Sequence, residues 1–155
     1  MWEQLQRYRA LDPEARKMFL RAAALLPVVK ASLRLRGFKK TRESLEERQR
    51  RESVRAAQTG SAPEQVLRTS RMVRAAAHWA TVGASCLEES LTLWHLLRKQ
   101  GHAARLRIGV CKTAEKFEAH AWVEHEGVAL NQIEEIHRHY AAFESEFSEQ
   151  SGEGT

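Results

Sequence analysis

The chain of 155 residues has few of the residue types on which small disulfide-stabilised proteins depend. Two cysteines, Cys86 and Cys111, are too few for a disulfide framework, and no cleavable secretory leader is recognisable. We therefore expect the protein in a reducing cytoplasm. The length and the apolar content suffice for one hydrophobic core but not for two, which predicts one domain with extensions.

Long apolar runs are also missing. The most apolar stretch, 18–29, is interrupted by Arg21 and Pro27 and closed by Lys30, well short of the ~20 residues that a bilayer-spanning helix needs. A helix that covers part of the core is the commoner use of this pattern. Because basic residues follow directly, peripheral contact with a membrane surface is left open.

The seven histidines lack the spacing of a known zinc site, so His125, His137 and His139 do not predict a metal. The chain has no glycine-rich phosphate loop and no interleaved aromatic and basic residues of the kind that bind nucleic acid. We expect no cofactor, no metal and no nucleic-acid partner.

Basic and acidic residues are unevenly distributed along the chain. Residues 1–80 hold eighteen Lys and Arg against eight Asp and Glu, whereas residues 81–155 hold seven against twelve. The two halves are therefore expected to do different jobs. We predict a basic helical region over 1–57, a core over 58–143 and a disordered acidic tail over 144–155.

Three helices are predicted before the core. One begins at Asp12-Pro13, bends near Pro27 and ends near Leu35, before Gly37. The second, 41–57, is nearly all charge and is expected to be solvated or to face a partner. The third runs from Pro63 to about Gly83 with apolar residues at helical spacing.

The predicted fourth helix carries Cys86, the most informative residue of the chain. Ser85 followed three positions later by Glu88 is a capping box, which places Cys86 in the first turn. The helix has a broad apolar face, so we expect it inside the domain, and Gly101 ends it.

Strands are predicted at 105–110, 119–124 and 128–131, which gives an α+β arrangement of a helix followed by an antiparallel meander. A two-residue turn at Glu126-Gly127 would pair His125 with Val128, 124 with 129, and Trp122 with Asn131. Asn131 would then share a face with His120. A loop one residue longer would move Asn131 to the opposite face.

These residues are the parts of a thiol acyl-transfer site. A helix N-terminus and a neighbouring imidazolium lower the pKa of a thiol from roughly 8.5. Cys86 would attack a carbonyl, His120 would take the thiol proton and return it to the leaving group, and Asn131 would orient the imidazole. The carboxylates of Glu88 and Glu89 work against this, so we expect them to face away or the activation to be modest.

Each residue also has a structural interpretation. A cysteine at a helix start is often a small buried hydrophobe, and Cys111 is given that role. His120 alone would be a core histidine. Trp94 is expected in the core, and Trp122 either in the core or beside the site, where it would contact substrate.

The same residues resemble the transglutaminase-like leader peptidases of bacterial lasso-peptide biosynthesis. The resemblance covers about 66–131 and is carried by Ser-Cys-Leu-Glu-Glu-Ser-Leu (85–91), Ala-Arg-Leu-Arg-Ile-Gly-Val (104–110) and Phe-Glu-Ala-His-Ala-Trp-Val-Glu (117–124). It implies a papain-like or transglutaminase-like core, in which the helix that carries the nucleophile packs on a small antiparallel sheet.

The resemblance also implies a cysteine peptidase that removes the leader from a ribosomally made precursor peptide. A separate leader-binding protein would assist it, and an ATP-dependent, asparagine-synthetase-like ligase would close the macrocycle. Cys86 and His120 match the catalytic pair. The third position is usually aspartate, but the only aspartate here is Asp12, so Asn131 is the candidate, with Gln132 and Glu134 as substitutes.

Two other functions are carried forward. An amine instead of water could resolve the acyl-enzyme, which would make the protein a transglutaminase or another amide-forming transferase. Alternatively, the basic half could make it a non-catalytic binding module, although docking of the leader or of the leader-binding protein is the preferred role for that half.

Overall fold

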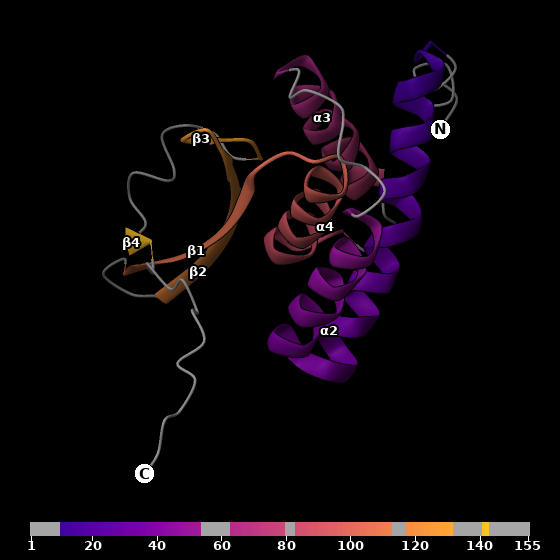
Figure 1. Cartoon of the computed structure of the whole chain (residues 1–155). Coiled ribbons are helices and arrows are strands. Elements are labelled where there is room, and N and C mark those ends of the chain that lie inside the picture. Colours follow the sequence, from indigo (N-terminus) through magenta and orange to yellow (C-terminus); the bar gives the residue numbers. More distant parts are fainter. Residues whose placement is uncertain (1–9, 54–62, 80–82, 113–116, 132–140, 143–155) are drawn as a thin grey trace.

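The computed structural model describes residues 10–53, 63–79, 83–112, 117–131 and 141–142. Its elements follow in the order α2 (Pro13–Ser53), α3 (Pro63–Trp79), α4 (Cys86–Lys99), β1 (Ala104–Lys112), β2 (Phe117–His125), β3 (Val128–Ala129) and β4 (Ala141–Ala142). Figure 1 shows the helices on one side and the sheet on the other, with α4 between α2 and the sheet. The expected α+β class is confirmed.

Helix α2 is broken at Gly37 and not at Pro27. Gly37 has a φ of 76°, a conformation that costs other residues free energy, so the helix axis changes direction there. Pro27 keeps helical dihedral angles, so the helix is not interrupted there, and the bend near Pro27 stays a prediction. A proline inside a helix removes one backbone hydrogen bond, yet its fixed φ is itself helical.

The second half of α2 packs on the core, contrary to the prediction that it is solvated or faces a partner. Thr41, Leu45 and Gln49 are buried at a spacing of four residues. The Thr41 hydroxyl donates to the Gly37 carbonyl at 2.8 Å, and Gln49 Nε2 lies 3.3 Å from Nδ1 of His95 in α4. Two of these three side chains are polar, which is why hydrophobic periodicity alone missed the face.

The core surrounds α4. Every residue from Ser90 to Leu97 is buried, because α2 and α3 cover one side of the helix and the sheet covers the other. Trp94 is buried as predicted. In the described part of the chain no helix is both long enough and apolar enough to cross a membrane.

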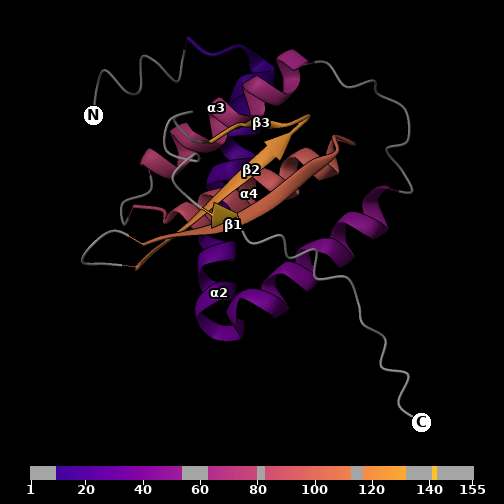
Figure 2. The same ribbon diagram turned by 90° about the vertical axis from the view of Figure 1, so that its left-hand side faces the viewer.

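The sheet has the strand order β3-β2-β1-β4 and lies across the helices, as Figure 2 shows. Strands β1 and β2 pair antiparallel over their full length, with Ile108 opposite Ala121 and Gly109 opposite His120. The predicted two-residue turn is confirmed: Glu126 and Gly127 both have positive φ, 50° and 79°, which is the geometry of a type I′ hairpin.

The predicted register after this turn is confirmed for two pairs, His125 with Val128 and Glu124 with Ala129. Strand β3 then ends, two residues earlier than predicted. The expected acidic tail, 144–155, and the substitutes Gln132 and Glu134 lie outside the described residues, and the division of the chain at residue 57 stays a prediction.

Candidate active site

Cys86 is the first residue of α4, as predicted from the capping box. The Ser85 hydroxyl accepts from the Glu88 amide at 3.3 Å, and the Glu88 carboxylate accepts from the Ser85 amide at 3.0 Å. These two bonds use the amides of Ser85 and Glu88 and leave those of Cys86 and Leu87 at the positive end of the helix. The half-buried Cys86 side chain therefore lies where anionic charge is stabilised.

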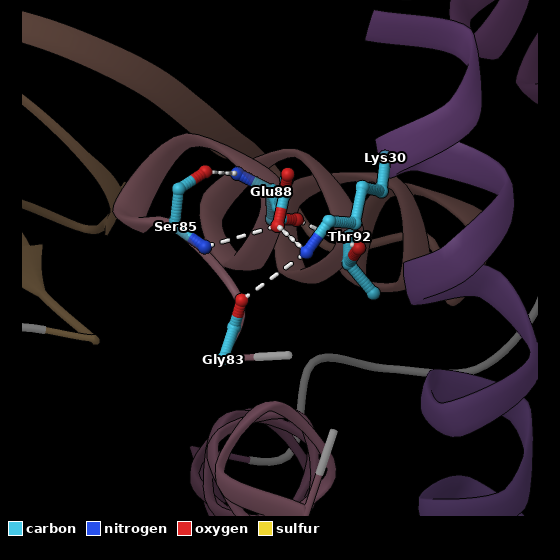
Figure 3. Close-up of polar contacts among 5 residues, drawn as sticks. All are labelled: Lys30, Gly83, Ser85, Glu88 and Thr92. Carbon is cyan, nitrogen blue, oxygen red and sulfur yellow. Dashed lines mark hydrogen bonds and ion pairs between the residues drawn. The ribbon is translucent and has the colours of Figure 1, made fainter. Parts of the chain in front are cut away.

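Lys30 of α2 reaches across to this helix start, as Figure 3 shows. Its ammonium donates to the Gly83 carbonyl at 3.3 Å and lies 3.9 Å from the Glu88 carboxylate. The negative charge of Glu88 is thus held between the Ser85 amide and Lys30. This arrangement limits the effect of one of the two carboxylates that were expected to oppose a thiolate.

Glu89 differs from Glu88 in its surroundings. Burial raises the pKa of the Glu89 carboxyl, and the Arg74 guanidinium lowers it to a smaller extent. Its Oε1 atom is buried without a hydrogen-bond partner in the described part of the chain. Because its pKa is raised, this carboxyl takes up a proton more readily than an exposed glutamate does.

His120 lies in the middle of β2, with its Nε2 atom buried. Burial lowers the pKa of the His120 imidazole, because the charged form loses hydration. The neutral ring that results at neutral pH is the form that can accept a proton. Trp122, two residues along the strand, stacks on this ring with the centroids 6.3 Å apart and the planes 16° apart. A role of Trp122 in binding substrate stays a prediction.

Ser90, which the sequence did not mark, connects the two elements that carry Cys86 and His120. It lies one helical turn after Cys86 and is fully buried. Its hydroxyl donates to the carbonyl of Ala121, the residue after His120, at 2.9 Å. The start of α4 is thereby fixed to the middle of β2. A direct contact between the Cys86 thiol and the His120 imidazole stays a prediction.

Asn131 belongs to the same network. Its Nδ2 donates to the Ser90 hydroxyl at 2.8 Å, and its Oδ1 accepts from the Val123 amide at 2.9 Å. The predicted strand pair of Trp122 with Asn131 is wrong, because β3 ends at Ala129. After Ala129 the chain turns away from β2, and the Leu130 carbonyl accepts from the Ser70 hydroxyl of α3 at 2.8 Å. The Val123 amide therefore bonds to the Asn131 side chain in place of a strand carbonyl.

This geometry gives Asn131 a structural function that the sequence did not predict: it joins β2 to α4 beside the two catalytic candidates. Its proposed function of orienting the His120 imidazole stays a prediction. In the part of the chain that the structure describes, no three His, Cys, Asp or Glu side chains form a group that could hold a metal ion.

Comparison with known proteins agrees with this arrangement. Searches of the curated proteins and of the solved structures found no match. The family model of the transglutaminase-like superfamily matches residues 25–145, a range that contains Cys86, His120 and Asn131. Members of this superfamily are typically cysteine peptidases or acyltransferases. The chain belongs to the transglutaminase-like superfamily.

Proposed function

We propose that the protein is a cysteine peptidase that removes the leader from a ribosomally made lasso precursor peptide. The observation that carries this proposal is the placement of Cys86 in the capped first turn of α4, which Ser90 ties to β2 beside His120. The family match supports a thiol hydrolase or acyltransferase. The finer assignment is supported by the resemblance of 85–91, 104–110 and 117–124 to lasso leader peptidases.

The proposed chemistry starts with transfer of the Cys86 proton to His120. The lowered pKa of His120 keeps the imidazole neutral and able to accept this proton near neutral pH. The sulfur then attacks the peptide carbonyl, and the free amides at the start of α4 stabilise the oxyanion. His120 donates its proton to the leaving amine, and an acyl-enzyme remains.

Water resolves the acyl-enzyme in the proposed reaction. His120 takes a proton from the water, the resulting hydroxide attacks the thioester, and the carboxylate product leaves as the thiol is restored. In the pathway that the resemblance implies, a separate leader-binding protein presents the precursor, and an ATP-dependent, asparagine-synthetase-like ligase consumes the cleaved product.

The test is cleavage of a lasso precursor peptide in the presence of its leader-binding protein, followed by mass spectrometry. Cys86→Ala should abolish cleavage while the fold is retained. Cys111→Ala is the matched control, because it removes the other cysteine of the chain, and it should remain active. A fully active Cys86→Ala variant would disprove the proposal.

The product masses separate hydrolysis from acyl transfer. Hydrolysis yields two fragments whose masses add up to the precursor plus one water. Transfer to an amine yields instead a product in which the acyl fragment is joined to that amine. The second result would reassign the protein as an amide-forming transferase with the same Cys86 and His120.

A further inference from the structure

We propose that a second site, at the opposite end of α4 from Cys86, binds an acidic segment of an extended peptide. The site is a groove of ≈ 450 Å³ between the second half of α2, the last turn of α4 and β1. The elements that form it can be followed in Figure 2. We call it the arginine groove, after the charged residues that line it: Arg42, Arg50, Arg98, Arg105, Arg107 and Glu46.

The arginine groove has more positive than negative charge. Glu46 pairs with Arg42 at 3.0 Å, and Glu124, on the neighbouring strand, lies 3.3 Å from Arg107. Arg98 and Arg105 are exposed and form no ion pair in the part of the chain that the structure describes, although Glu124 lies opposite Arg105 on β2. Guanidinium groups bind carboxylates and phosphates through paired hydrogen bonds, so these two arginines can bind an anionic ligand.

The spacing of the arginines fits an extended peptide better than a small anion. Arg105 and Arg107 are two residues apart on β1 and share one face of the sheet, which separates them by about 7 Å. That distance equals the repeat of alternate side chains in an extended peptide. Arg42 and Arg50 are two helical turns apart, about 12 Å along α2, so the groove has room for about four extended residues.

Peptide is favoured over nucleic acid because, among the described residues, the groove exposes no aromatic ring on which a base could stack. The aromatic residue that lines it, Trp94, is only 4% exposed and belongs to the core. Proteins that bind single strands rely on exposed aromatic rings for stacking.

The position of the groove adds a length requirement for any peptide that also occupies the Cys86 site. Cys86 and Arg98 are in the first and last turns of the fourteen-residue helix α4, about 20 Å apart. About six extended residues span that distance. A substrate that engages both sites therefore carries its acidic segment at least about six residues from the bond that is cut.

Binding can be measured without catalysis, so the test is independent of the peptidase activity. The full-length Cys86→Ala protein is titrated into a fluorescein-labelled peptide of four Glu-Ser repeats, and fluorescence anisotropy is recorded. The matched probe has Gln-Ser repeats. We expect the glutamate probe to bind at least about tenfold more tightly than the glutamine probe, because the interaction depends on carboxylates.

The variant Arg98→Glu/Arg105→Glu should weaken binding of the glutamate probe at least about tenfold. The control Arg21→Glu/Arg71→Glu makes the same change in net charge at exposed positions outside the groove and should change binding by less than about twofold. If circular dichroism shows that the first variant is unfolded, Arg98→Gln/Arg105→Gln replaces it, with the same direction of effect expected.

Three results would overturn the proposal. The first is absence of binding to the glutamate probe at physiological salt. The second is equal weakening by the groove and control variants, which would indicate long-range attraction without a site. The third is a single-stranded oligonucleotide of the same charge that binds more tightly and displaces the peptide, which would reassign the groove to nucleic acid.

Discussion

At the scale of single residues, the contacts of Ser90 explain how the candidate site is held. Its hydroxyl is fully buried and takes part in two hydrogen bonds, as donor to Ala121 and as acceptor from Asn131. Ala121 follows His120 in β2, and Asn131 is itself a catalytic candidate. Ser90 lies one helical turn after Cys86. The position of α4 relative to β2 therefore depends on a serine that has no chemistry of its own to perform.

Replacement of Ser90 by alanine should lower both stability and activity. We expect the free energy of unfolding to fall by about 1–3 kcal/mol, because the Ala121 carbonyl and the Asn131 amide each lose a buried partner. Chemical denaturation measures this. Ser44→Ala, at a partly buried position of α2, is the control and should change the free energy by less than about 0.5 kcal/mol. An equal effect of the two variants would contradict the structural role of Ser90.

The placement of Cys86 could be predicted from sequence because a capping box is a local pattern of four residues. The partners of Asn131 could not. They depend on the bond between Ser70 and the Leu130 carbonyl, which are sixty residues apart, and no pattern near Asn131 indicates that bond. The lowered pKa of His120 also follows from burial, which is a property of the folded chain.

At the scale of elements, Lys30 makes polar contacts from α2 to the start of the nucleophile helix. Its bonds are long and its side chain is about one quarter exposed, at 23%. Such an ion pair contributes little to stability, because solvent screens it. Loss of the Lys30 contact should therefore change the rate of peptide cleavage and only slightly change the free energy of unfolding.

Lys30→Met should lower the rate of peptide cleavage several-fold while it lowers the free energy of unfolding by less than about 1 kcal/mol. The reason is that the Gly83 carbonyl and the Glu88 carboxylate lose the cation that positions them beside Cys86. Lys39→Met, at an exposed position after the Gly37 break, is the control. Unchanged cleavage by Lys30→Met would show that the contact has no functional role.

Elements with strong local signals were predicted and those with mixed signals were not. The turn at Glu126-Gly127 was predicted because a glycine between alternating strands favours a two-residue hairpin. The buried face of the second half of α2 was missed because two of its buried side chains, Thr41 and Gln49, are polar.

At the scale of the whole molecule, two histidines connect stability to pH. Burial lowers the pKa of His102, with a smaller contribution from the charge of His125, and burial lowers the pKa of His120. Both ring nitrogens of His102 are buried without a hydrogen-bond partner in the described part of the chain. Protonation of either ring is therefore easier in the unfolded chain than in the folded protein.

The free energy of unfolding should therefore decrease as the pH falls through about 6.5, the ordinary pKa of histidine, and level off below the lowered folded-state pKa. His102→Phe should reduce this loss without lowering stability at pH 7.5, because the buried nitrogens have no partners to lose. His78→Phe, at an exposed position, is the control. Denaturation curves between pH 7.5 and 5.5 measure the effect, and identical slopes for wild type and His102→Phe would contradict it.

The charge asymmetry of the chain was visible in the sequence, but the arginine groove was not. The groove combines arginines from 42–50 with Arg98, Arg105 and Arg107, which lie on the other side of the charge boundary near residue 80. Only the packing of α2 against α4 and β1 brings them together. The α+β class and the transglutaminase-like superfamily were predictable because the nucleophile helix and the His120 strand each carry a complete local motif.

The central claim is that Cys86 and His120, 34 positions apart in the sequence, act as one thiol–imidazole pair. The most direct measurement is the rate of Cys86 alkylation by iodoacetamide between pH 6 and 8, in a Cys111→Ala background, with His120 present or replaced by Gln. We predict that His120→Gln slows alkylation at least about tenfold near pH 7 while circular dichroism is unchanged. Equal rates in the two proteins over the whole pH range would contradict the claim.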